Sequence, residues 1–409
     1  MLRAQAKEKH ISFHTPGHKQ KGLDITELSY SDNLSCPKGC ILKAEQDVTA
    51  ILGSKKSFIL TDGSTSGVLS MLHAAKTLGA KTVCCSQNTH KSVFNGCALL
   101  GLSLLTYTEN RKRNIPYPTT MYEMNEVLLK SDAVLLTYPD YYGNLAPIKA
   151  LASFCKRENK LLLIDGAHGS HLHYDKEIYG GVYADMWVDG VHKNLPSYTQ
   201  GAIVSANTEA CAKALEKAVD VFRTTSPSYP IMASVEYAVK YPENILLKSY
   251  AENLERSNDR FYFGGDWTKL CVKFGEFAFE AEKQLQKQGL YPEFCDGNVL
   301  LFYLSPALKI KDLKKLERAL YSLFKKFPYR KIEAKERTFD LPPAPSEREW
   351  IPLSQSENRL CAATCGLFPP CFPLLLQGER ITKDKIELLS KSDNAFGLHD
   401  NKICVYKEE

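Results

Sequence analysis

Short apolar runs alternate with longer amphipathic segments from about residue 55 to residue 206. The segments between the runs, such as SGVLSMLHAAKTLGA, have helical spacing and end in Gly or charged residues. This alternation predicts βα units and an α/β fold with a mostly parallel seven-stranded sheet flanked by helices. The seven runs are SFILTDG (57–63), KTVCCSQ (81–87), LSLLTYT (102–108), AVLLTYP (133–139), LLLIDGA (161–167), DMWVDG (185–190) and GAIVSAN (201–207).

The pattern changes after residue 210, first to long helical segments. From about residue 266 it changes to apolar runs followed by the helical KDLKKLERALYSLFKKF. This second pattern indicates a smaller C-terminal α+β domain. We therefore expect an N-terminal arm at 1–45, a large domain at 46–250 and a C-terminal small domain at 251–409.

Charge and composition exclude several classes of protein. The formal net charge of +5 is small for 409 residues, and the Lys and Arg residues are scattered among acids, so we predict no nucleic-acid partner. The N-terminus is charged and no run reaches 18 apolar residues, which predicts a cytoplasmic protein without a membrane partner. The thirteen cysteines are dispersed, which favours reduced, mostly buried thiols over a disulfide framework.

Ligands in an open α/β sheet bind outside the carboxyl ends of the strands, so the residues after each run are candidates. The first run is followed by GSTSG (63–67) and then by a helix, where N–H groups, hydroxyls and the positive helix end form an anion cradle. Such turns often serve only chain geometry. His90 follows the second run, where a lone histidine is more often a capping or core residue.

An acid and a lysine follow two later runs. Asp165 ends an apolar run, and a buried carboxylate there needs a cationic or hydrogen-bonding partner. Lys193 follows the sixth run. Most lysines are solvated surface charges, but this one shares a sheet edge with the cradle and the acid. Together these features meet the needs of pyridoxal 5'-phosphate: a phosphate cradle, a Schiff-base lysine, an acid for the pyridine nitrogen, and His90 as a stacking ring.

Nine segments along the chain resemble, in the same order, the pyridoxal-phosphate-dependent ornithine/lysine/arginine decarboxylases of the aspartate-aminotransferase-like fold. The resemblance is to a short form that lacks the N-terminal wing of the long members. The segments are FHTPGHKQKG (13–22), CPKGCILKAEQ (36–46), FILTDGSTSG (58–67), NTHKSVFNG (88–96), LTYPDYYGNLAPI (136–148), LLIDGAHGSH (162–171), HKNLPSYTQGA (192–202), TTSPSYPIMAS (224–234) and FPPCFPLLLQGERI (368–381).

The resemblance implies a role for each matching residue. Lys193 matches the cofactor lysine, Asp165 the partner of the pyridine nitrogen and His90 the stacking histidine, and these three are the implied catalytic residues. The TTSPSY segment resembles one that the family presents to the neighbouring subunit, which implies a homodimer with sites near the interface. The remaining implied cofactor contacts are Ser64, Thr65 and Ser66 in the phosphate loop, Ala167 under the ring and His192 near the phosphate.

The resemblance further implies decarboxylation of arginine, lysine or ornithine to the corresponding polyamine-pathway amine and CO2. Either His90 or His168 could donate a proton, and the sequence does not choose between them. The distal cation of such a substrate needs an acidic partner, yet nothing singles one out among 47 Asp and Glu residues.

Three positions depart from the family pattern. Gly190 stands two residues before His192, where the family commonly has Ser, so one phosphate hydroxyl is missing. Cys371 replaces a glycine in LFPPCFP, and Ala363 stands where an acid often precedes that motif. The last two positions belong to the region that shapes the substrate pocket.

Other functions compete with this one. The segment DGAHGSHLHYD crowds three histidines and two acids into eleven residues, and on a strand extension His171 and His173 would share a face with metal-ligand spacing. A metal-dependent hydrolase would leave the cradle and Lys193 unused, and Cys361, Cys365 and Cys371 are irregularly spaced, so we predict no metal site. Another amino-acid lyase, a transaminase or a non-catalytic relative on the same scaffold stays open.

Overall fold

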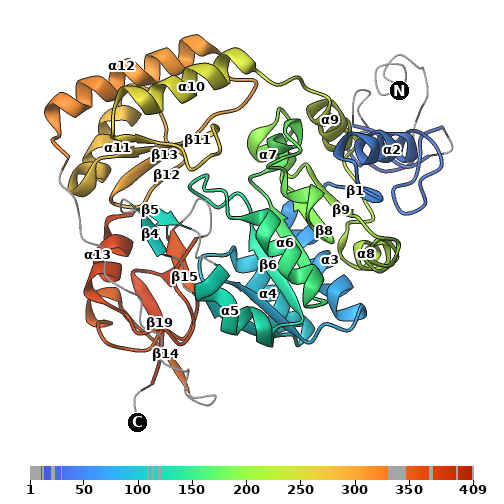
Figure 1. Cartoon of the computed structure of the whole chain (residues 1–409), viewed down its shortest axis with the longest axis horizontal. Helices are drawn as coiled ribbons and strands as arrows, with labels where there is room; N and C mark the ends of the chain where they lie inside the picture. Colours follow the sequence, from blue (N-terminus) through green and yellow to red (C-terminus); the bar gives the residue numbers. More distant parts are fainter. Residues whose placement is uncertain are drawn as a thin grey trace.

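The computed structural model describes residues 11, 13–19, 24–28, 30–107, 110–112, 115–117, 121–329, 347–367, 372–392 and 395–407. Figure 1 shows a central sheet with its helices, coloured blue to green, beside a second group of helices and small sheets, coloured yellow to red. Within the described residues no helix is both long and apolar enough to cross a membrane. Ten of the twelve described cysteines are buried, as predicted.

The central sheet has seven strands in the order β1-β9-β8-β7-β6-β2-β3. All seven predicted runs form these strands, and the mostly parallel sheet is confirmed. β9 is antiparallel to both of its neighbours, β1 and β8, so the other six strands point the same way and their carboxyl ends share one edge. The bounds are β1 Lys56–Leu60, β2 Thr82–Ser86, β3 Ser103–Tyr107, β6 Ala133–Thr137, β7 Leu161–Gly166, β8 Met186–Asp189 and β9 Ala202–Ala206.

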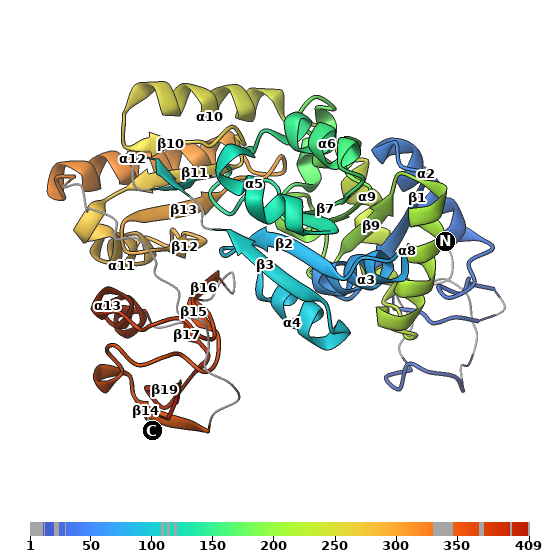
Figure 2. The same cartoon turned by 60° about the horizontal axis from the view of Figure 1, so that its bottom comes forward.

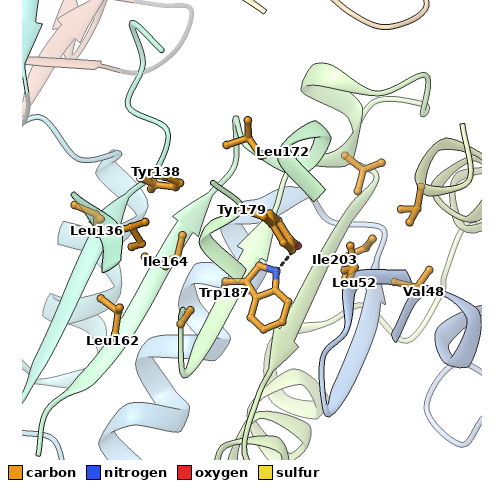
Figure 3. Close-up of a cluster of buried hydrophobic side chains, with 14 of the residues drawn as sticks. Val48, Leu52, Leu136, Tyr138, Leu162, Ile164, Leu172, Tyr179, Trp187 and Ile203 are labelled. Carbon is orange, nitrogen blue, oxygen red and sulfur yellow. Dashed lines mark hydrogen bonds between the residues drawn. The ribbon is translucent and has the colours of Figure 1, made fainter. Parts of the chain in front are cut away.

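Helices cover both faces of the sheet because successive strand residues point to opposite sides. On β7, Leu163 packs with α3, α4 and α8, whereas Leu162 and Ile164 pack on the other side with α2, α6 and α9. Figure 3 shows this second side, where Trp187 from β8 and Val48 from α2 belong to one buried cluster. The bounds are α2 Cys40–Leu52, α3 Gly63–Thr77, α4 Lys91–Leu100, α5 Met121–Lys130, α6 Ile148–Arg157, α8 Glu209–Phe222 and α9 Tyr229–Val239.

A four-stranded antiparallel sheet follows in the order β10-β11-β13-β12. Its strands are β10 Phe261–Tyr262, β11 Lys269–Lys273, β12 Phe294–Cys295 and β13 Val299–Tyr303, and three helices pack with it: α10 Ile245–Ser257, α11 Ala278–Gln286 and α12 Ile310–Lys326. The helix α12 illustrates why these segments fold as they do. Leu313, Leu316, Leu320 and Leu323 recur at helical spacing and are buried, so one stripe of α12 faces the sheet.

The remaining strands form small antiparallel sheets (Figure 2), which agrees with the predicted C-terminal α+β region. One contains β14 Arg348–Pro352, β19 Lys402–Tyr406 and β18 Leu398–His399, and another contains β16 Phe372–Leu375, β15 Cys365–Leu367 and β17 Ala395–Phe396, near α13 Lys383–Lys391. β4 Asn110–Lys112 pairs with β5 Ile115–Tyr117. The short helices are α7 Val191–Asn194, η1 Ser170–Tyr174, η2 Gly180–Val182, η3 Gly275–Phe277 and η4 Leu353–Gln355.

Candidate active site

The predicted residues meet at the carboxyl edge of the central sheet. Lys193 lies on the single turn α7, directly after β8, and its backbone N–H donates to the carbonyl of Gly190 over 3.0 Å. Its Nζ lies 3.1 Å from Nε2 of His168, which follows β7. Burial lowers the pKa of His168 well below its ordinary value, and the Lys193 ammonium lowers it further, so His168 is neutral. A neutral imidazole can accept a proton from Lys193. The structure therefore places His168, one of the two candidate proton donors, against the lysine.

Asp165 ends β7 and is only 2% exposed. The Ala167 N–H donates to its Oδ1 over 3.1 Å. Burial raises the pKa of Asp165, while the nearby Lys193 ammonium opposes that rise. A buried carboxylate with this environment is suited to a further cationic partner.

His90 is the N-cap of α4, as the simpler capping hypothesis predicted. Its Nδ1 accepts from the Ser92 N–H over 3.2 Å and lies 2.8 Å from the Ser92 hydroxyl. Burial lowers the pKa of His90 to about 4, and Lys193 contributes to that shift. His90 thus caps a helix and lies within electrostatic reach of Lys193, and the two roles are compatible.

The loop at 63–66 forms the first turn of α3. Asp62 is a residue type that commonly caps helices, yet within the described residues its carboxylate makes no cap bond and instead accepts from the Thr224 N–H over 3.0 Å. The first N–H groups of a helix have no intrahelical partner. The buried Thr61 hydroxyl beside this turn also has no partner in the described part of the chain. This end of α3 therefore fits a phosphate group.

The three hydroxyls of the loop are not equivalent. Ser64 is half-buried and Thr65 is exposed, whereas the Ser66 hydroxyl donates to the Gly63 carbonyl over 3.0 Å. Because that hydroxyl proton is already used, Ser64 and Thr65 are the residues of the loop whose hydroxyls can donate to an anion. His192, on α7, makes a 2.9 Å hydrogen bond from Nδ1 to the Gly201 carbonyl, which leaves Nε2 for another partner.

Gly190 has a packing reason for its lack of a side chain. A Cβ at this position would lie 2.3 Å from the carbonyl oxygen of Ala167, a backbone atom that cannot move aside cheaply. Ala167 itself is buried. A serine at position 190 would therefore displace the backbone under the site, and the departure from the family pattern is consistent with the local structure of this chain.

The other two departures lie away from these residues or outside the described chain. Ala363 packs against the small cluster of Ala362, Cys404 and Tyr406 in the C-terminal part. Cys371 falls outside the described residues.

Sequence reasoning missed three residues from the smaller sheet region. The Tyr303 hydroxyl lies 2.9 Å from Nδ1 of His168, and Lys269 donates to the His168 carbonyl over 3.2 Å. Glu293 accepts from the Tyr141 hydroxyl at 3.3 Å. Nothing in the run DGNVLLFYLS distinguishes Tyr303 from an ordinary strand residue. The one signal in the sequence is Lys269, a charged residue at the start of an apolar strand. Its side chain is fully buried.

The metal-site hypothesis does not survive the structure. That rival hypothesis required a strand extension with His171 and His173 on one face, whereas residues 170–174 form the 3₁₀ helix η1. His171 Nε2 is instead bonded to Asp266 Oδ1 over 2.8 Å, and His173 Nδ1 to the Ser170 carbonyl over 2.7 Å. In the described ranges no group of three or more His, Cys, Asp or Glu side chains is arranged to hold a metal ion.

Comparison with known proteins identifies the family. Residues 21–260, more than half of the chain, match the major domain of the Orn/Lys/Arg decarboxylases. The chain belongs to the Orn/Lys/Arg decarboxylase family. Among its relatives, the uncharacterized protein YaaO of Bacillus subtilis is 26% identical over 97% of this chain and 96% of its own length. An arginine decarboxylase of the same organism is 23% identical over 96% of this chain and 93% of its own length.

Solved structures of this family share the fold. The lysine decarboxylase of Francisella novicida superposes with a TM-score of 0.77 at 16% identity, covering 99% of this chain and 80% of that one. The constitutive lysine decarboxylase of E. coli gives a TM-score of 0.69 at 18% identity, covering 99% of this chain and 81% of that one. The structural similarity therefore extends over 99% of this chain, including the region after residue 260.

Proposed function

We propose that this member of the family is a pyridoxal-5'-phosphate-dependent decarboxylase that converts arginine, lysine or ornithine to the corresponding amine and CO2. The observation that carries the proposal is the contact between Lys193 and neutral His168, beside the buried Asp165, at the carboxyl edge of the sheet. A lysine within reach of a neutral base is the arrangement of an activated amine.

The residues of the site fit the cofactor. The start of α3, which has no side-chain cap, suits the phosphate. Ser64 and Thr65 would contribute hydroxyls and His192 its Nε2, while Ser66 closes the turn through its bond to the Gly63 carbonyl. Asp165 suits a protonated pyridine nitrogen, because a cation there relieves the cost of its burial. Ala167 leaves room under a ring and His90 can cover it. When bound, pyridoxal phosphate supplies an electron sink for the bond to CO2.

The chain's own residues have distinct tasks in this proposal. Lys193 holds the cofactor and exchanges it with the substrate amine. His168 accepts or returns a proton at Lys193 Nζ through Nε2. The aromatic rings of Tyr141 and Tyr303 lie beside His168, with ring centroids 4.9 and 5.4 Å away, and exclude water from this side of the site.

We further propose that the chain is a homodimer in which the segment 224–229 faces the partner's site. Thr225 and Ser226 are exposed, while Thr224 is bonded to Asp62 beside the phosphate loop. A partner seated on this segment would therefore lie close to the cradle. The proposed limits of the three regions remain 1–45, 46–250 and 251–409.

Measured CO2 release tests the function directly. The purified chain, supplied with pyridoxal phosphate, should release CO2 from at least one of arginine, lysine and ornithine and form the matching diamine or agmatine. Amino-group transfer to a keto acid without CO2 release would instead favour the transaminase, and inactivity of a cofactor-loaded protein on all three would favour the non-catalytic relative.

Glu293 is the best placed acid for the distal cation of the substrate. It is half-buried, it accepts from Tyr141, and burial raises its pKa while Lys193 and Lys269 oppose that rise. Glu293 is therefore near Lys193 and separated from His168 by the Tyr141 ring. An aliphatic side chain lying along the aromatic rings would bring its cation to this carboxylate.

Replacement of Glu293 by Gln should raise KM for the basic substrate about 10- to 100-fold, the cost of one hydrogen bond between charged groups. A smaller change in kcat is expected, because the distal group binds equally in the ground and transition states. Asp296→Asn is a matched control, since Asp296 is only three residues away but accepts from the Tyr142 hydroxyl and from backbone N–H groups. Equal KM values for the two variants would rule Glu293 out.

A further inference from the structure

His168 is bonded on both ring nitrogens by residues from different parts of the chain. Lys193 of α7 lies at Nε2, and Tyr303 at the end of β13 lies at Nδ1. These partners are 25 and 135 residues away in sequence. The protonation pattern of the ring is therefore decided jointly by the large sheet and the smaller one (Figure 1).

The two contacts together select one tautomer of His168. An ammonium group has only donors, so protonated Lys193 must donate and Nε2 must be the bare acceptor. The neutral ring then carries its proton on Nδ1 and donates it to the Tyr303 oxygen. Burial raises the pKa of Tyr303 well above its ordinary value, so the phenol stays neutral and keeps an oxygen lone pair for this bond. The opposite tautomer would place N–H against N–H at Lys193.

Tyr303 is itself firmly placed. It pairs directly with Lys269 across β11 and β13, and the Lys269 ammonium lies 4.7 Å from the centre of the Tyr303 ring. The same ammonium donates to the His168 carbonyl. Gly143 packs closely against Lys269, because a Cβ added at Gly143 would lie only 2.5 Å from the Lys269 Cβ. Ring and backbone of His168 are thus held by one pair of neighbouring strand residues.

We propose that Tyr303 is a positioning residue that fixes the His168 tautomer and thereby raises the proton affinity of the Lys193 amine. The inference deepens the proposed function, since it takes Lys193 as the reactive lysine. Other titratable groups within electrostatic reach of Lys193 include Asp165 from β7, His90 from α4, Glu293 from the segment before β12 and His192 from α7 itself. All of them are unchanged by removal of a phenol oxygen at position 303.

The test compares Tyr303→Phe with Tyr262→Phe. Tyr262 is a matched control because it is a buried tyrosine of the same sheet whose hydroxyl donates to Asn144. The full chain, stripped of any bound aldehyde with hydroxylamine, is exposed to trace acetic anhydride over a range of pH. Acetylation of the peptide that contains Lys193 is then measured by mass spectrometry, which gives the apparent pKa of its amine.

In Tyr303→Phe the Nδ1–H loses its acceptor and the ring can adopt the other tautomer, in which His168 Nε2 no longer accepts from Lys193. The apparent pKa of Lys193 should fall by about one unit, as expected for one hydrogen bond to a charged group. Below that pKa the labelling rate should rise about tenfold, while Tyr262→Phe should match the unchanged chain. A Tyr303→Phe curve that superposes on the Tyr262→Phe curve overturns the proposal.

A second measurement can be made even if the Tyr303→Phe variant does not fold. In the unchanged chain labelled with ¹⁵N-histidine, the His168 ring should carry its proton on Nδ1, with signals assigned by their loss in His168→Gln. A proton on Nε2 contradicts the proposal. Neither experiment needs cofactor or substrate, so a failure to release CO2 would overturn the proposed function and leave these outcomes unaffected.

Discussion

Replacement of Lys193 by alanine is expected to lower decarboxylation by about 10⁴- to 10⁶-fold, the range seen when the nucleophile of an enzyme site is removed. The reason is that no other described lysine has the same setting. Lys269 also contacts His168, but its ammonium is bonded to Asp266 and Thr268 and is fully buried. It cannot take over the exchange with a substrate.

The attachment itself can be measured apart from the activity. Borohydride reduction of the cofactor-loaded chain, followed by peptide mass spectrometry, should find the pyridoxyl group on Lys193 and nowhere in Lys193→Ala. Lys213→Ala is the control, because Lys213 is an exposed residue whose ammonium pairs with surface Glu209 at 3.5 Å. Reduction that labels a different lysine in the unchanged chain would contradict the assignment.

Replacement of Lys269 by methionine should lower the free energy of unfolding by about 3–5 kcal/mol, because it leaves one charge of a buried ion pair without its partner. Asp266 and Lys269 are both inaccessible to solvent and their charged atoms lie 3.1 Å apart. Burial alone would raise the pKa of Asp266, but His171 and Lys269 hold that pKa well below its ordinary value. Asp266 is therefore ionised, and the variant buries a negative charge with less compensation.

The double variant Asp266→Asn/Lys269→Met should be less destabilised than the sum of the two single changes, since it removes both charges. Lys160→Met is the control: Lys160 is half-buried, and its ammonium donates to the carbonyls of Leu129 and Ser131. We expect its loss to cost about 1 kcal/mol. Urea unfolding of the unchanged chain, the two single variants, the double variant and the control measures these differences, and additive single effects would show that the pair is not coupled.

The central sheet was predictable because its signals are local. A strand buried on both faces is a short apolar run, and all seven runs became strands at nearly the expected residues. The direction of β9 was not readable in the same way. GAIVSAN has the same kind of apolar composition as the six parallel strands, and only the pairing with β1 and β8 shows that β9 is antiparallel.

The candidate site was likewise predictable only in part. The strand-end positions of Asp165, His90 and Lys193 follow from the sheet, because parallel strands bring their carboxyl ends to one edge. The sequence does not show which histidine contacts Lys193, because His90 and His168 both follow strands of the same sheet. The loop after β7 turns into the 3₁₀ helix η1, which directs His171 to Asp266.

The sequence by itself thus determined the sheet and the edge at which the candidate residues of the large region lie. Each of these depends on periodicity or on turn composition within a few residues. Only the tertiary structure decided that Tyr303, Lys269 and Glu293 belong to the same site. Their contacts join residues 101 to 152 positions apart, and such contacts depend on how one folded sheet packs against another, which no local pattern encodes.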